Sequence, residues 1–138
     1  MKNYLISLIG LFFVVFASAY SFAADSYHHE TVSESPEDSE FSGKLENAIR
    51  VIEIKASRYK FEPDPVVVKF GEKVRLVATS TDVNHGIAIS EFKVNLSIPA
   101  GKTETVEFIA DKKGIFHAYC SVYCGSGHSH MQASFIVK

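Results

Sequence analysis

The chain has 138 residues, 46% of them hydrophobic, and a formal net charge of −2. This length suffices for one hydrophobic core, so we expect a single folded domain. Lysine and arginine residues are scattered among acidic ones, which excludes the concentrated basic footprint of a nucleic-acid-binding domain.

The first 24 residues form an apolar segment. No charged residue occurs between Lys2 and the end of this segment, where small residues gather. Such a segment is typical of a secretory signal peptide, and its length is near the ~20 residues that an uncleaved membrane anchor needs. We favour a signal peptide for residues 1–24. Either alternative places the rest of the chain in the periplasm or another extracytoplasmic compartment, with membrane contact only through an uncleaved segment.

An acidic segment follows. Residues 25–46 hold seven acidic residues and one lysine, with Ser and Pro and few large apolar side chains. This composition predicts a disordered linker, and we give its adjacent His28 and His29 no metal-binding role. Residues 47–138 carry 12 basic and 9 acidic residues. A small positive charge of this kind could favour docking of a partner by complementary charge.

Three stretches of the remaining chain alternate polar and apolar side chains, at residues 50–55, 72–79 and 103–109. This period of two is typical of half-buried antiparallel strands. Pro and Gly punctuate the chain at the short intervals of a sandwich or small barrel, and no segment sustains a helical period. The sequence therefore predicts an all-β domain, a Greek-key β-sandwich. We expect its core to include Phe61, Val74, Leu76, Phe108, Phe116 and Phe135.

Two final strands, predicted at residues 115–119 and 132–137, enclose a loop with soft metal ligands. The loop holds Cys120, Cys124, His128 and Met131. Thiolate, imidazole and thioether are ligands that copper prefers over hard cations. Two glycines permit the tight loop that convergence of these ligands requires.

The loop needs a further ligand from elsewhere in the chain, and we expect His85 to supply it. In an extended strand His117 has the opposite parity to Cys120 and points away from the site. His130 is expected to face solvent, although an exchange of roles with His128 stays open.

These residues resemble the dinuclear purple copper (CuA) domain of cytochrome c oxidase subunit II, also found at the C-terminal end of nitrous oxide reductase. The family's loop pattern Cys-x3-Cys-x3-His-x2-Met matches the loop, and its Asp-x-x-His pattern matches Asp82 and His85. The resemblance runs from about residue 49 to the C-terminus and implies a cupredoxin domain over residues 47–138. It implies these ligand roles: Cys120 and Cys124 bridge two copper ions, His85 and His128 each bind one, Met131 is a weak axial ligand, and the carbonyl oxygen of Val122 completes the set.

The resemblance also implies a function. Two copper ions would transfer single electrons, in a cytochrome c oxidase subunit II-like protein or a periplasmic carrier. The implied partners are a redox donor such as cytochrome c and a haem-copper oxidase or other electron acceptor. The chain supplies no acid, base or substrate pocket, so we expect at most an oxidase subunit without a catalytic site of its own.

Two departures from the family bear on its partners. The loop position commonly occupied by Glu is Val122, which keeps a carbonyl for copper but removes a carboxylate that helps to hold magnesium at the subunit interface. The chain has no Trp, so the aromatic patch that usually receives electrons from cytochrome c is absent or rebuilt. Tyr59 and Phe61 are candidates for a rebuilt patch.

Other interpretations of the loop stay open. A mononuclear blue-copper site could use Cys124, His128, Met131 and His85, which leaves Cys120 without a role. Copper delivery or storage could use the same ligands, although such proteins tend to expose several Met and His residues. A structural disulfide fits an oxidising compartment but leaves the His and Met spacing unexplained. A thiol redox enzyme favours a cysteine at a helix N-terminus, where no helix is predicted.

Overall fold

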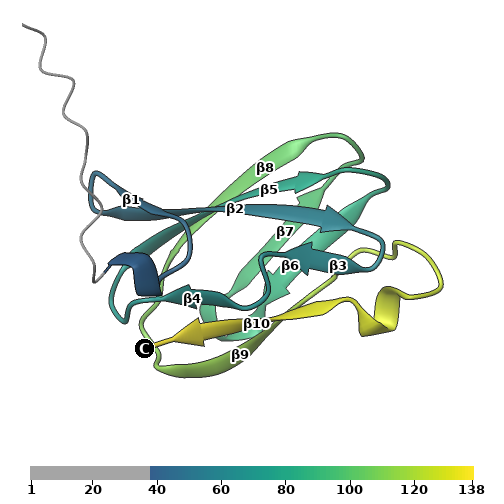
Figure 1. Ribbon diagram of the computed structural model, residues 1–138. Helices are drawn as coiled ribbons and strands as arrows, with labels where there is room; N and C mark the ends of the chain where they lie inside the picture. Colours follow the sequence, from purple (N-terminus) through teal and green to yellow (C-terminus); the bar gives the residue numbers. More distant parts are fainter. Residues whose placement is uncertain (1–37) are drawn as a thin grey trace, which may run out of the picture. The chain divides into compact units, whose positions relative to one another are not determined.

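The computed structural model describes residues 38–138, shown in Figure 1. The predicted signal segment and residues 25–37 of the predicted linker, with His28 and His29, lie outside the described residues. The described part begins with the 3-10 helix η1 (Asp38–Glu40) and strand β1 (Lys44–Glu46). Regular structure therefore starts before residue 47, where we had expected the domain to begin. Within residues 38–138 no helix has the length and apolar character needed to cross a membrane.

One sheet contains five strands. Its hydrogen-bonded order is β1-β2-β5-β8, and β3 pairs with β2. These strands are β2 (Ile49–Ser57), β3 (Lys60–Glu62), β5 (Lys73–Ser80) and β8 (Thr103–Ile109).

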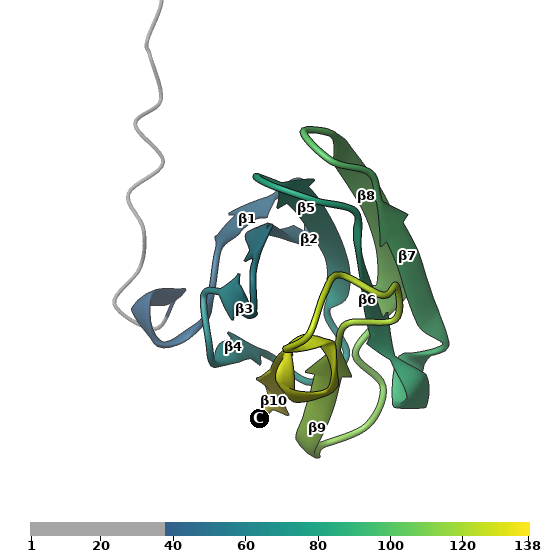
Figure 2. The ribbon, with the colours of Figure 1, turned by 90° about the vertical axis from the view of Figure 1, so that its right-hand side faces the viewer.

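The second sheet also contains five strands, in the order β4-β10-β9-β6-β7. They are β4 (Val66–Val68), β6 (His85–Ile89), β7 (Val94–Ile98), β9 (Gly114–Tyr119) and β10 (Gln132–Val137). Two further 3-10 helices, η2 (Ser90–Phe92) and η3 (His128–His130), lie in connections. The expected all-β sandwich is confirmed, and Figure 2 shows the two sheets curving around a shared centre.

Strand direction differs from the sequence-based expectation at two places. We expected antiparallel strands, but β2 pairs with β5 in parallel, and β10 pairs with β4 in parallel. The chain leaves the first sheet after β3, contributes β4 to the second, and returns as β5. A strand that returns in this way can run in the same direction as its neighbour, which a hairpin cannot do.

The core lies between the sheets and follows from side-chain alternation. In β5, Val74, Leu76 and Ala78 face inward and are buried, whereas the intervening residues are more exposed. Burial of such side chains is the main favourable term in folding. Four of the expected core residues are buried, and Phe108 and Phe116 are partly buried and pack against them. Phe61 is 2% exposed, so its proposed place in an exposed aromatic patch was wrong.

The two strands that carry the ligand loop are paired along their full length. In the β9/β10 pair, Gln132 is opposite Tyr119 and Val137 is opposite Gly114. The loop between them leaves the sandwich at one end, where η3 faces the viewer in Figure 2. A paired scaffold therefore fixes both ends of this loop.

Candidate metal centre

The loop between β9 and β10 is closed at its base by the backbone. The N–H of Cys120 donates to the carbonyl of Met131 at 3.0 Å. Inside the loop, the N–H of His128 donates to Gly125 at 3.0 Å, which begins the single turn of η3. Gly125 has φ of +130°, a conformation that other residues avoid. This glycine lets the chain reverse and returns His128 towards the cysteines.

Five expected ligand side chains converge at this end of the sandwich. The Sγ atoms of Cys120 and Cys124 are 3.7 Å apart. His85 Nδ1 lies 3.8 Å from Cys120 Sγ, and His128 Nδ1 lies 3.8 Å from Cys124 Sγ. Met131 Sδ is 3.7 Å from Cys124 Sγ. Each sulfur of the cysteine pair thus has its own imidazole neighbour.

These separations fit a metal. Two sulfur atoms bound at about 2.3 Å to one tetrahedral ion lie ~3.8 Å apart, close to the spacing of the Cys120 and Cys124 sulfurs. The ligand atoms of His85, Cys120 and Cys124 all lie within 4.8 Å of one another. Sulfur and imidazole together select copper over hard cations. The residues therefore form a site suited to copper.

Burial distinguishes the ligands from the other histidines of the described residues. His85 is 0% exposed, Met131 is 1% exposed and both cysteines are 4% exposed. His117 is exposed on β9, as its parity predicts. His130 is also exposed, with Nδ1 3.2 Å from Ser129 Oγ. The structure places His128, and not His130, against the cysteine sulfur.

Val122 lies at the rim of the site. Its carbonyl oxygen is 3.1 Å from Cys120 Sγ, so a backbone oxygen stands beside the sulfur pair. The backbone of β6 approaches the loop closely, since a Cβ added to Gly86 would lie 2.4 Å from Ser121 Oγ. This close approach brings the adjacent His85 to the loop.

The two cysteines are free thiols in the structure. Their sulfur separation far exceeds a disulfide bond of about 2.03–2.05 Å, so the structural-disulfide interpretation does not describe this arrangement. Burial raises the pKa of Cys124 to about 11, and hydrogen bonding to Cys120 adds to the increase. A bound cation would reverse this preference, because metals bind the thiolate form.

Asp82 fixes the orientation of His85. The Nε2 atom of His85 lies 2.7 Å from Asp82 Oδ1, so Nδ1 of the same ring turns towards the sulfurs. Burial alone would raise the pKa of Asp82, but hydrogen bonds from the Arg58 backbone and the His85 ring lower it to about 2. The carboxylate therefore stays ionised and accepts a hydrogen bond from the Nε2–H group of His85. Such partners determine the tautomer and the orientation of metal-binding histidines.

Arg58 and Tyr59, which lie outside the loop, also contact it, and the sequence pattern did not predict these contacts. Arg58 Nε donates to the Cys124 carbonyl at 3.3 Å. Tyr59 lies against the loop glycines, with its hydroxyl 3.4 Å from Ser126 Oγ. Arg58 lies 66 positions before Cys124, so no local motif could have connected them. From the sequence, Tyr59 was expected only as a candidate for an aromatic surface patch, and no role was expected for Arg58.

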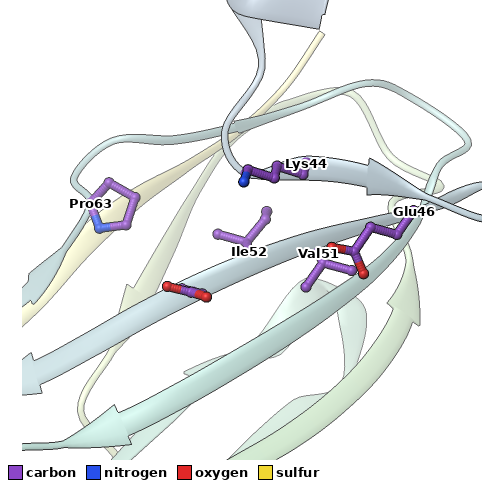
Figure 3. A pocket seen from close by; sticks show the side chains of 7 residues that line it. Lys44, Glu46, Val51, Ile52 and Pro63 are labelled. Carbon is purple, nitrogen blue, oxygen red and sulfur yellow. The ribbon is translucent and has the colours of Figure 1, made fainter. Parts of the chain in front are cut away.

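A separate pocket of about 290 Å³ lies at the β1–β2 hairpin. Figure 3 shows Lys44, Glu46, Val51, Ile52 and Pro63 around it. None of its lining residues is a ligand of the metal centre. The pocket and the expected copper ligands therefore have no residue in common.

Comparisons with known proteins agree with this geometry. Residues 26–137 match the family "Cytochrome C oxidase subunit II, periplasmic domain". Cytochrome c oxidase subunit 2 of Thermus thermophilus is 30% identical over 83 residues, which are 60% of this chain and 62% of that protein. Nitrous-oxide reductase of Cupriavidus necator is 32% identical over 106 residues, 73% of this chain but 16% of the reductase. The chain thus spans less than two thirds of either relative.

A solved structure shows the same fold. The periplasmic domain of subunit II of cytochrome oxidase from Bradyrhizobium japonicum superimposes with a TM-score of 0.61 at 21% sequence identity. The match covers 69% of this chain and 88% of that domain. The cupredoxin architecture of the described residues is therefore confirmed.

Proposed function

Because this chain belongs to the family of cytochrome c oxidase subunit II periplasmic domains, we propose that it binds two copper ions as a CuA centre and transfers single electrons. The observation that carries the proposal is the pairing of each buried cysteine sulfur with its own histidine. Cys120 lies beside His85, and Cys124 lies beside His128, both at 3.8 Å. This arrangement offers equivalent ligands to two ions.

A mononuclear site makes poorer use of the same residues. It would employ Cys124, His128, Met131 and His85 and leave Cys120 without a role. Yet Cys120 is 4% exposed, and its sulfur lies 3.8 Å from His85 Nδ1. A dinuclear site gives both cysteines the same bridging role, and Met131 and the Val122 carbonyl then provide weaker ligands at the two ends.

The protein's contribution to electron transfer is rigidity and exclusion of water. When bound, the two copper ions share one transferred electron, which spreads the charge over both. Cys120 and Met131 are held by a backbone hydrogen bond at the loop base, and His85 is held by Asp82. A frame that resists movement keeps the reorganisation energy low when the oxidation state changes. Burial of the ligands keeps water from replacing them.

We propose a periplasmic or extracytoplasmic location, with cytochrome c or a similar redox protein as donor and a haem-copper oxidase as acceptor. The name of the Thermus relative, cytochrome c oxidase subunit 2, supports this assignment. Copper delivery is less well supported, because Met131, the one methionine among the described residues, is buried. Ligand exchange between proteins would require accessible sulfur.

Electron paramagnetic resonance of the copper-loaded full-length chain tests the proposal. We expect two copper atoms per chain and hyperfine splitting from two equivalent nuclei. Splitting from one nucleus would favour a blue-copper site, and tightly bound Cu(I) without a redox-active signal would favour delivery.

Two variants make the test specific. Cys120→Ser should abolish the dinuclear spectrum, because a bridging sulfur is lost. His130→Gln is the matched control, because it removes an exposed imidazole from the same loop and should leave the spectrum unchanged. A Cys120→Ser protein with the wild-type spectrum would refute the bridging assignment.

A further inference from the structure

Arg58 is connected to both halves of the metal centre. It lies between β2 and β3, outside the ligand loop. Its side-chain Nε donates to the carbonyl of Cys124 at 3.3 Å, and its backbone N–H donates to Asp82 Oδ2 at 2.8 Å. The other carboxylate oxygen of Asp82 lies 2.7 Å from His85 Nε2. One residue thus supports the loop that carries one cysteine–histidine pair and the carboxylate that orients the other histidine.

Arg58 also brings a formal positive charge to a region with few charges. Residues 114–137, which include the whole ligand loop, contain no Asp, Glu, Lys or Arg. Among residues 38–138, two charged side chains hydrogen-bond to an expected ligand residue: Arg58 bonds to Cys124, and Asp82 bonds to His85. The Arg58 guanidinium group is therefore a positive charge beside a ligand loop that has no formal charge of its own.

We propose that Arg58 is a positioning residue whose guanidinium charge raises the reduction potential of the copper centre. The proposal rests on the proposed redox function. A reduced centre carries one positive charge fewer than an oxidised one, so a neighbouring cation favours reduction. Groups that hydrogen-bond to the surroundings of a metal ligand tune the metal in this way. Asp82 acts in the opposite direction, so Arg58 also offsets its negative charge.

The influence of the Arg58 charge on the reduction potential must depend in part on salt concentration. Arg58 is exposed, and the interaction of an exposed charge is screened within about 10 Å at 0.1 M ionic strength. A residue that only held the loop in place through a hydrogen bond would influence the potential equally at low and high salt. The dependence on ionic strength therefore separates a charge effect from a purely structural one.

Redox titration of the copper-loaded full-length chain at low ionic strength provides the test. Arg58→Gln keeps a hydrogen-bond donor but loses the charge, and it should lower the potential. Arg58→Lys keeps the charge and should stay closer to the wild type. Lys60→Gln is the matched control, because it removes one positive charge two residues away. The Lys60 side chain is 61% exposed and pairs with Glu62 at 3.1 Å, so its loss should shift the potential less.

The outcomes distinguish this proposal from the proposed function. If the wild-type chain shows no dinuclear spectrum, the proposed function fails. Two results would overturn the role of Arg58 when that spectrum is present. In the first, Arg58→Gln and Arg58→Lys shift the reduction potential equally; in the second, Arg58→Gln shifts it no more than Lys60→Gln does. If Arg58→Gln does not load copper, Arg58→Met takes its place in each comparison, because it also removes the charge. The difference in potential between this variant and the wild type should shrink as salt is added, and a difference that stays constant would overturn the charge effect.

Discussion

Gly127 lies directly against the ring of Tyr59. A Cβ atom built on Gly127 would be 2.4 Å from Tyr59 Cδ2, closer than two such atoms can approach. The same ring closes over Gly125, where a Cβ would be 2.5 Å from the hydroxyl oxygen. The strand connection that carries Tyr59 therefore packs on the ligand loop, and it does so only because these loop positions lack side chains.

We expect Gly127→Ala to destabilise the domain by about 1–3 kcal/mol, the usual cost of an overpacked contact. The added methyl group must displace the Tyr59 ring or the loop. His128 follows directly in the chain, so a displaced loop should also broaden the copper spectrum. Urea unfolding of the metal-free protein and resonance spectra of the loaded protein measure the two effects.

A double-mutant cycle provides the control for this contact. Tyr59→Ala removes the ring, so Gly127→Ala should cost much less in that background than in the wild type. Equal costs in both backgrounds would show that the ring does not restrict the loop.

The local features of this protein could be predicted from its sequence. Strand β8 was expected at residues 103–109 and occurs at Thr103–Ile109, because alternation within one strand is a local pattern. The four loop ligands lie within twelve residues, so their spacing alone indicated a metal site. His85 was identified by its pattern with Asp82, and these two residues do contact each other.

Relationships between distant segments could not be predicted in this way. Alternation does not reveal which strands become neighbours, so the parallel pairing of β2 with β5 was missed. The same pattern did not decide between burial and exposure for Phe61, which faces the core. The Arg58 contact with Cys124 depends on how two loops meet, and no sequence period encodes it.

The Met131→Leu substitution should retain the dinuclear spectrum and raise the reduction potential. Met131 Sδ lies 3.7 Å from Cys124 Sγ, and we propose that it is a weak copper ligand. Loss of an electron-pair donor destabilises the oxidised state more than the reduced one. Leucine has a similar volume, so the metal-free protein should lose less than about 1.5 kcal/mol of stability. Redox titration and thermal unfolding check the two expectations, and loss of the dinuclear spectrum would make Met131 an essential ligand.

Copper binding should release protons, with an affinity that rises with pH. The pKa of Cys124 is raised to about 11, chiefly by burial, so its thiol is protonated in the metal-free protein at neutral pH. Copper binds the thiolate, so each binding event must expel this proton. For every proton released, the apparent affinity should increase about tenfold per pH unit below the thiol pKa. Calorimetry in buffers of different ionisation enthalpy counts the protons, and a pH-independent affinity would contradict this assignment.

Electron transfer to this domain should depend only weakly on salt. The small positive charge of residues 47–138 first suggested docking by complementary charge, but residues 114–137 carry no formal charge. The most exposed large apolar side chain of the ligand loop is Tyr123, which is 75% exposed and lies 5.7 Å from the His128 ring. Steered association falls steeply with ionic strength, whereas contact through an uncharged aromatic surface does not.

Stopped-flow reduction of the copper-loaded chain by cytochrome c tests this expectation. Tyr123→Ser should slow the second-order rate severalfold and leave the reduction potential unchanged. Ile115→Ser is the matched control, because Ile115 is 72% exposed on β9, outside the ligand loop, and its loss should leave the rate unaltered. A wild-type rate that falls more than about tenfold between low and physiological salt would show that charge guides the encounter. In that case Arg58, and not Tyr123, would be the first residue to examine at the docking surface.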